Sequence, residues 1–399
     1  MSFAGLLVIF CTEMATSVEE SSPSQDSPQN TIETYCVAYV LSYRDPNYIR
    51  TQSLLQALTR APGIRLVLAR NTSSGIRRYL ETLRSLRNLQ AVERPDIYLL
   101  GFRGHEIFWP VRFLIKNAPL IVDAFMSPSA ALSEEHRGGW IGKILAPMIG
   151  FLERQLLQNA QYVLTDTRLH ADFLARMFSL QREKIYAMPV GAIETDMPKI
   201  ENRLADGAFR VLFYGSFLPL HGVNVIVAAA AMLKELPIAF DFVGGTTRRA
   251  KCLHEQCKSL GVENYTYRKW VPISDLIATE IPQASLCLGG PFGATPQARR
   301  VITSKTSQCL AQGRPTVVGQ IDESAGFVNR ENCLLVAQGD ARALADAIRW
   351  AFENPDLLPA IGDRGRSLYL ERLSIAVVTE SLERLLRQAA ALESGGAAK

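Results

Sequence analysis

Two glycine-containing loops in the second half of the chain carry residue types that can hold a phosphate group. In the first loop, Gly215 follows an apolar run and Gly222 precedes a helical pattern, with Ser216 and His221 between them. Glycine allows a ligand to approach the backbone closely, a helix start offers N–H groups to an anion, and histidine can carry a positive charge. The pattern predicts a diphosphate site, although an ordinary strand-to-helix turn has the same appearance.

The second loop contains a run of glycines over residues 289–293, followed by a basic pair and a short helical pattern. Ser304 is the expected N-cap residue, which places Lys305 on the first turn of the helix. First-turn residues are usually acidic because of the helix dipole, whereas a lysine there suits a phosphate. We therefore assign Lys305 to the same diphosphate. The basic pair, Arg299 and Arg300, is typical of a solvated surface.

Asp123 is a further candidate, because it closes an apolar run that reads as a buried strand. A charged residue is rarely buried without a partner or a function. We take Asp123 as a candidate catalytic residue, with helix capping as the alternative. Neither His105-Glu106 nor His136-Arg137 has the spacing of metal ligands, and no DxD motif stands at a strand end. The sequence therefore predicts no metal site.

Residues 138–158 form a long apolar helical pattern that also contains Lys143 and Arg154. A helix of this kind is expected inside a large domain. The alternative is a membrane-contacting surface, because the pattern combines large apolar residues with these two basic ones.

The elements that must position these residues alternate regularly between strand and helix. Apolar, β-rich runs end near residues 41, 69, 101, 124, 165 and 189 in the first half and near 214, 243, 269, 288, 319 and 336 in the second. Strands that alternate with helices predict parallel, doubly wound sheets. We expect a disordered leader over 1–31, a Rossmann-like domain over 32–190, a linker over 191–206, a second Rossmann-like domain over 207–362, a helix over 363–393 that packs back on the first domain, and a disordered tail over 394–399.

Composition narrows the class of protein. The 399 residues carry a net charge of +4, which is too small for a nucleic-acid-binding protein but suits anionic phosphates or an anionic membrane surface. No apolar run is long enough to predict a transmembrane helix. The seven cysteines include no CxxC pair, which favours a reducing compartment. We expect a cytoplasmic protein, with peripheral contact to the inner face of the cell membrane.

Together the two loops resemble the bacterial retaining glycosyltransferases called group 1 or glycogen-synthase-like. The similarity is strongest from residue 213 to residue 319, where Gly215 and Gly222 occupy the two glycine positions around the nucleotide diphosphate. A downstream pattern, Gly-x-x-x-x-Glu-Asn-x-x-Leu-Val, is also present, with Gly326, Glu331, Asn332, Leu335 and Val336. The resemblance implies the GT-B fold, in which two Rossmann-like domains face a central cleft.

The chain departs from the family pattern at several positions. Ser216 and His221 stand where the family often has arginine and lysine, and Gln308 replaces the second glutamate of a Glu-x7-Glu motif, which usually meets the ribose. The first glutamate, which usually meets the donor sugar, has no counterpart. A longer loop takes its place, and the resemblance assigns the donor sugar to Phe292, Gly293, Ala294 and Thr295. It assigns the nucleotide base to Trp270, Val271 and Asp275, although Trp270 also suits a core position.

The resemblance implies transfer of a sugar from a nucleoside diphosphate sugar to a hydroxyl acceptor, with retention of anomeric configuration and without a metal or another cofactor. We expect a role in the synthesis of a cell-surface polysaccharide or glycolipid, with an acceptor, lipid-linked or free, on the side of the N-terminal domain. Two alternatives stay open: a GT-B sugar-nucleotide epimerase and a catalytically degenerate binding or scaffold subunit.

Overall fold

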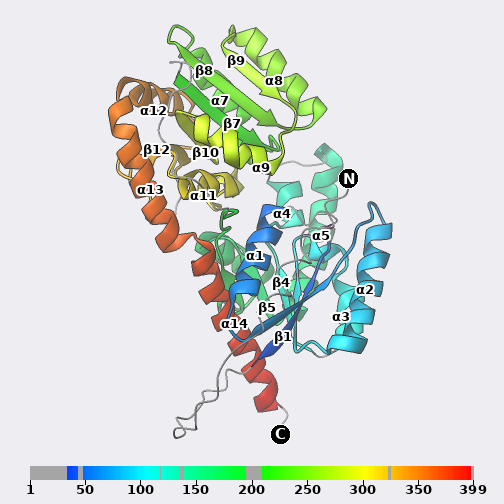
Figure 1. Cartoon of the computed structure of the whole chain (residues 1–399). Helices are drawn as coiled ribbons and strands as arrows, with labels where there is room; N and C mark the ends of the chain where they lie inside the picture. Colours follow the sequence, from blue (N-terminus) through cyan, green and yellow to red (C-terminus); the bar gives the residue numbers. More distant parts are fainter. Residues whose placement is uncertain are drawn as a thin grey trace, which may run out of the picture. The chain divides into compact units, whose positions relative to one another are not determined.

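The computed structural model describes residues 34–43, 48–116, 118–134, 139–194, 209–321 and 325–396 (Figure 1). The predicted leader over 1–31, residues 195–206 of the predicted linker, His136-Arg137 and the last three residues of the predicted tail lie outside this part. Within it, no helix is long and apolar enough to cross a membrane.

The first half of the described chain forms a parallel six-stranded sheet in the order β2-β1-β3-β4-β5-β6. Its strands are β1 (Tyr35–Val40), β2 (Ile64–Ala69), β3 (Ile97–Leu100), β4 (Leu120–Asp123), β5 (Tyr162–Thr165) and β6 (Ile185–Ala187). Strands β3, β4 and β5 are buried along their whole length, as expected of parallel strands that lie between two layers of helices.

Helices cover both faces of this sheet. One face packs against α2 (Arg77–Glu93), α3 (Phe108–Ile115), α5 (Gly139–Asn159) and α6 (Arg168–Phe178). The other packs against α1 (Ile49–Arg60) and α14 (Ile375–Gly396), which lie side by side (Figure 1). The short helix α4 (Pro128–Ser133) packs against α5. The last helix of the chain thus contributes to the core around its first strand.

The second half forms another parallel six-stranded sheet, in the order β12-β11-β10-β7-β8-β9. Its strands are β7 (Phe209–Gly215), β8 (Ile238–Gly244), β9 (Tyr265–Arg268), β10 (Leu286–Gly290), β11 (Thr316–Gly319) and β12 (Leu334–Val336). The main helices are α7 (Val223–Ala231), α8 (Thr247–Leu260), α11 (Ser304–Ala311), α12 (Ala341–Glu353) and α13 (Leu358–Arg372). Two doubly wound parallel sheets confirm the predicted α/β fold.

The end of the chain differs from the single helix predicted over 363–393. The structure has two helices, α13 and α14, which are separated at Leu373 and Ser374. The Ser374 hydroxyl accepts a hydrogen bond from the Val377 N–H at 3.4 Å, so Ser374 starts a new helix as an N-cap residue. Helix α14 continues to Gly396, three residues into the tail that was expected to be disordered.

Strand order places the loops of the second sheet. Strands β7 and β10 are neighbours although β8 and β9 separate them in sequence. The order therefore reverses between them, and ligands of open parallel sheets bind at such a reversal, beyond the carboxyl ends of the strands. The loops that follow Gly215 and Gly290 both start at this point.

Candidate functional site

The structure brings Gly215, His221 and Lys305 together at the end of β7. Gly215 has a φ of +143°. A Cβ atom built on it would lie 3.2 Å from Cε1 of His221 and 3.4 Å from Nζ of Lys305. A basic and a titratable group therefore converge on a position that has no side chain of its own, as binding of an anion to the backbone requires.

The second loop supports the first one directly. Gly222 adopts a φ of +67°, and a Cβ on it would lie 2.5 Å from the backbone nitrogen of Gly293. The Gly293 N–H donates to the carbonyl of Leu220 at 3.0 Å. Two backbones approach each other without side chains between them, so these glycines are required for close packing of the loops.

Lys305 is a buried cation at the start of α11. Thr303, not Ser304 as predicted, is the N-cap residue, and its hydroxyl accepts from the Thr306 N–H at 3.3 Å. Lys305 is 5% exposed, and its Nζ lies 5.6 Å from the centroid of the Phe213 ring. No described residue accepts a hydrogen bond from Lys305 or forms an ion pair with it. Burial lowers the pKa of Lys305 to about 7, against an opposing effect of Cys309.

A buried ammonium group without an anion is unfavourable, because desolvation of the charge is not compensated. A phosphate placed against Gly215 would supply the missing anion. Lys305 is therefore the residue that most clearly marks this place as a ligand site.

His221 lies between the loop and the helix that follows it and is nearly buried. Its Nδ1 accepts a hydrogen bond from the Leu218 N–H at 3.3 Å. The proton of the neutral ring is therefore on Nε2. This geometry favours His221 as a neutral hydrogen-bond donor, whereas the sequence suggested a cation.

Ser216 is exposed, and its carbonyl accepts from the Arg249 guanidinium at 2.7 Å. Arg249 lies on the first turn of α8, and sequence reasoning did not assign it to the site. A third glycine turn, Gly244 and Gly245 at the end of β8, could have pointed to it. The Gly245 N–H donates to the carbonyl of Gly215 at 2.8 Å, so this turn lies against the first loop. Arg249 therefore holds the first loop from the side of α8.

The amide of Gln308 makes a contact that the sequence did not predict. It is fully buried, its Oε1 accepts from the Ile193 N–H at 2.9 Å, and its Nε2 donates to the Ile193 carbonyl at 3.3 Å. A ribose hydroxyl would have to displace this backbone pair. The amide joins α11 to the segment after β6, and only an amide can serve both an N–H and a carbonyl.

We expect Gln308→Glu to lower stability by about 2–3 kcal/mol, because a buried carboxylate would face the Ile193 carbonyl. Thermal unfolding measures this loss. If Gln308 instead meets the ribose, as its family counterpart does, the variant should keep its stability and bind a nucleoside diphosphate more tightly.

The four residues assigned to the donor sugar separate into two pairs. Phe292 is fully buried in the core of the second sheet, and Gly293 packs against the first loop. Ala294 is exposed and Thr295 half-buried, with the Thr295 hydroxyl accepting from the Ala298 N–H at 3.2 Å. Phe292 thus anchors the loop, and contact with a sugar stays a prediction for Ala294 and Thr295.

The residues assigned to the nucleotide base lie after β9. Trp270 is 74% exposed, so the alternative of a core residue is wrong. Val271 packs partly against the cluster that contains Leu276, and Asp275 is exposed. Their contact with a base remains a prediction.

Asp123 is not available as a catalytic residue. Its side chain is fully buried and pairs with Arg50, whose Nη2 lies 3.0 Å from Oδ1. Arg50 also donates to the carbonyls of Met188 at 2.7 Å and Thr165 at 3.2 Å. Burial raises the pKa of Asp123, against the opposing charge of Arg50. Neither catalysis nor helix capping explains Asp123; it binds the arginine that joins three strand ends.

The carboxyl edge of the first sheet carries an aromatic group that sequence reasoning missed: Tyr43, Tyr48, Phe102 and Phe125. The rings of Tyr48 and Phe102 stack with centroids 4.1 Å apart, and the Phe125 ring meets both in a T-shaped, edge-on arrangement. These residues follow β1, β3 and β4, around the place where the strand order reverses between β1 and β3. A sugar or another ligand with an apolar face suits such rings.

Arg300 joins the second loop to the first half of the chain. Its guanidinium binds the carboxylate of Glu134 next to α4, with one contact at 3.2 Å, and lies 3.7 Å from the centroid of the Phe173 ring on α6. Its carbonyl accepts from the Thr167 hydroxyl. The expectation of a solvated pair is therefore wrong for Arg300, while Arg299 is exposed.

A cavity of about 640 Å³ is lined by residues of both halves, including Asp166, Ile302 and Arg372.

The described residues contain no group of three or more His, Cys, Asp or Glu side chains that could hold a metal ion. Their six cysteines are free thiols, and all except Cys252 are buried.

Residues 208–354 match the model of the family "Glycosyl transferases group 1". No curated protein sequence matches the chain. The match covers both glycine loops, Lys305 and Gln308, and with them the whole site in the second sheet.

Several known structures share the fold. HepE of Anabaena in complex with UDP-glucose is similar with a TM-score of 0.67 at 13% identity, over 89% of this chain and 100% of that one. Sucrose-phosphate synthase of Thermosynechococcus elongatus is similar with a TM-score of 0.67 at 16% identity, over 90% and 100%. The pneumococcal O-GlcNAc transferase GtfA, in complex with UDP and GlcNAc, has a TM-score of 0.55 at 14% identity, over 77% and 60%. At these identities the similarity shows the fold, which is GT-B.

Proposed function

We propose that this chain, whose residues 208–354 match the model of the family "Glycosyl transferases group 1", transfers a sugar from a nucleoside diphosphate sugar to a hydroxyl acceptor. The observation that carries the proposal is the buried ammonium group of Lys305, which lies beside Gly215 without an anionic partner among the described residues. A diphosphate is the anion that fits a glycine loop and a helix start.

The proposed mechanism stabilises the leaving diphosphate. Negative charge develops on the diphosphate as its bond to the sugar breaks. Lys305, the N–H groups at the start of α7 and Nε2–H of His221 would neutralise that charge in a place shielded from water. We propose that these groups do the work that a metal does in other transferases, and that the anomeric configuration is retained. With Asp123 paired to Arg50, no protein nucleophile is assigned.

We propose that the acceptor binds at the carboxyl edge of the first sheet, against Tyr43, Tyr48, Phe102 and Phe125. Arg300 ties the donor loop to Glu134 beside α4 and to Phe173 of α6 in the first half of the chain, and this contact supports the assignment. A role in cell-surface polysaccharide or glycolipid synthesis fits it, with a lipid-linked acceptor and a site of action at the inner face of the cell membrane.

A panel of nucleotide sugars, incubated with the full chain, tests the proposal by release of the nucleoside diphosphate. UDP-sugars come first, because HepE was crystallised with UDP-glucose and GtfA with UDP and GlcNAc. We expect hydrolysis of at least one donor. Binding of UDP without turnover on any donor and acceptor would favour the degenerate binding subunit, and interconversion of the sugar without transfer would favour the epimerase.

We expect turnover to be unchanged by EDTA, because Lys305 is placed to supply the positive charge that a metal would otherwise provide. Rates measured with EDTA, with magnesium and with manganese should agree within error. Loss of turnover in EDTA and its recovery with manganese would contradict the metal-independent mechanism.

A further inference from the structure

Helix α5 exposes an unusually apolar surface. The exposed residues form what we call the α5 apolar stripe: Trp140, Ile141, Ile144, Leu145, Met148, Phe151 and Leu152. Trp140 is 72% exposed and Phe151 61%. Their spacing of three or four residues, with adjacent pairs, gathers them on one side of the helix. The sequence favoured a buried helix here, and that expectation is wrong, since only five residues of α5 are buried.

The α5 apolar stripe has a basic edge. Lys143, Pro147 and Arg154 follow one line along the helix, because residues separated by four and seven positions share a face, and both cations are exposed. The single acidic residue of α5, Glu153, is buried and accepts from the hydroxyls of Ser127 at 3.0 Å and Ser129 at 2.7 Å. Helix α5 therefore presents apolar and positive groups but no carboxylate.

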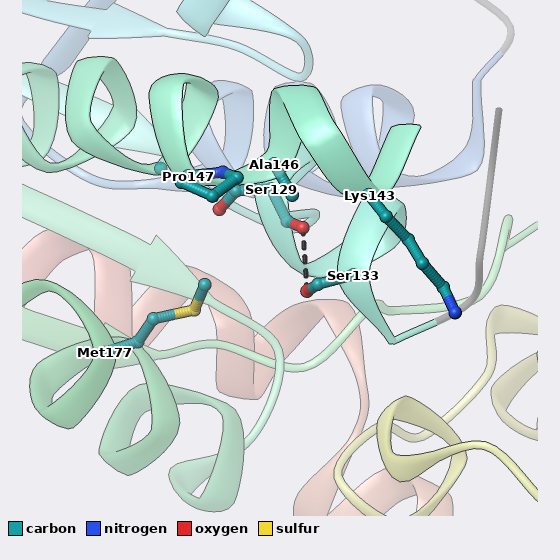
Figure 2. A pocket seen from close by; sticks show the side chains of 7 residues that line it. Ser129, Ser133, Lys143, Ala146, Pro147 and Met177 are labelled. Carbon is teal, nitrogen blue, oxygen red and sulfur yellow. Dashed lines mark hydrogen bonds between the residues drawn. The ribbon is translucent and has the colours of Figure 1, made fainter. Parts of the chain in front are cut away.

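A cavity of about 520 Å³ opens along the same edge. Its walls come from three helices, as Figure 2 shows: Ser129 and Ser133 of α4, Lys143, Ala146 and Pro147 of α5, and Met177 of α6. Apolar walls combined with two serines and a lysine suit an amphiphilic group with a phosphate, such as a lipid headgroup.

We propose that the α5 apolar stripe binds the surface of an anionic lipid bilayer, with Lys143 and Arg154 at the level of the lipid phosphates. Large apolar side chains beside lysine and arginine are the features by which a helix lies in a membrane interface. A symmetric contact between two copies of the chain would place the same basic edge on both sides of the interface, without a carboxylate from α5 to neutralise it. The proposal rests on the proposed function only in placing the acceptor at a membrane.

Sedimentation of the full chain with vesicles tests the proposal. Vesicles of phosphatidylglycerol and phosphatidylcholine should bind the native chain, and binding should weaken as salt rises. The variant Ile144→Glu/Phe151→Glu should bind about tenfold more weakly or not at all, and Lys143→Glu/Arg154→Glu should lose about tenfold on anionic vesicles. Leu357→Glu/Leu370→Glu, which places the same two charges on exposed leucines outside α5, is the matched control and should bind like the native chain.

Three results would overturn the proposal: no vesicle binding by the native chain, equal binding by native chain and α5 variants, or a native dimer that Ile144→Glu/Phe151→Glu converts to a monomer without any vesicle binding. The last result would assign the stripe to a second copy of the chain.

UDP affinity, measured in parallel, should be equal in all variants because the proposed donor site lies in the second half. Failure of UDP binding or of sugar transfer with vesicle binding intact would count against the proposed function alone.

Discussion

Asp123→Ala should destabilise the first half of the chain by about 3–5 kcal/mol, the usual cost of removing one partner of a buried ion pair. Both side chains of the Arg50–Asp123 pair are fully buried. The variant leaves a guanidinium without its carboxylate, and Arg50 would no longer be held where it donates to the carbonyls of Met188 and Thr165. Thermal unfolding should therefore begin many degrees lower, while UDP affinity in folded protein stays unchanged.

Two further variants separate a structural role from a catalytic one. Asp172→Ala breaks the half-exposed pair between Asp172 and Arg182 and should cost less than about 1 kcal/mol, as surface ion pairs do. Arg50→Met combined with Asp123→Leu should recover part of the lost stability, because no buried charge remains. If Asp123→Ala folds with native stability but loses turnover, Asp123 is a catalytic residue after all.

The sequence predicted best where the position of a residue depends on its neighbours along the chain. Gly215, Gly222 and Lys305 were assigned from a strand end, a helix start and an unexpected charge on a first turn. All three features are local, and the parallel sheet brings them together through the adjacency of β7 and β10. The alternation of strands and helices likewise predicted two doubly wound sheets, because period and length are visible in a short window.

The sequence failed where the partner of a residue lies far away in the chain. Asp123 pairs with Arg50, Gln308 with Ile193, and Arg300 with Glu134, over separations of 73, 115 and 166 positions. The residues next to Asp123, Gln308 or Arg300 in the sequence do not show that its side chain binds a distant partner. The exposure of α5 was missed for a related reason. An apolar helical pattern indicates that the helix packs against an apolar surface, but it does not show whether that surface belongs to the same domain or to a partner.

Lys305→Met should weaken UDP binding by about 1.5–3 kcal/mol, the range for a hydrogen bond to a charged group, or roughly 10- to 150-fold in Kd. Methionine keeps the length and most of the volume of the side chain but removes the charge. Isothermal titration with UDP measures the loss. Lys234→Met, at an exposed lysine after α7, is the matched control and should bind UDP like the native chain.

The same substitution should stabilise the protein without ligand. The pKa of Lys305 is about 7 in the folded chain because of burial, against about 10.4 in an unfolded chain. Between pH 7 and about pH 10.4 the unfolded state binds more protons than the folded state, so the stability of the folded state rises with pH over this range. Below pH 7 Lys305 is charged in the folded state, and burial of this charge lowers the stability. Removal of the charge should raise stability at pH 6.5 by roughly 2–4 kcal/mol and by much less at pH 9, which thermal unfolding at the two pH values measures.

The pH dependence of UDP binding completes the test. A diphosphate beside Nζ raises the pKa of Lys305, since an opposite charge favours the protonated form. Binding then takes up a proton above pH 7, and UDP affinity should fall as pH rises from 7 to 9, by at most about tenfold per unit. Ionisation of the phosphate is common to native chain and Lys305→Met, so the difference between their two curves isolates Lys305. Parallel curves, or an unchanged affinity in Lys305→Met, would show that the ammonium does not meet the diphosphate, and the buried charge would then require another anion.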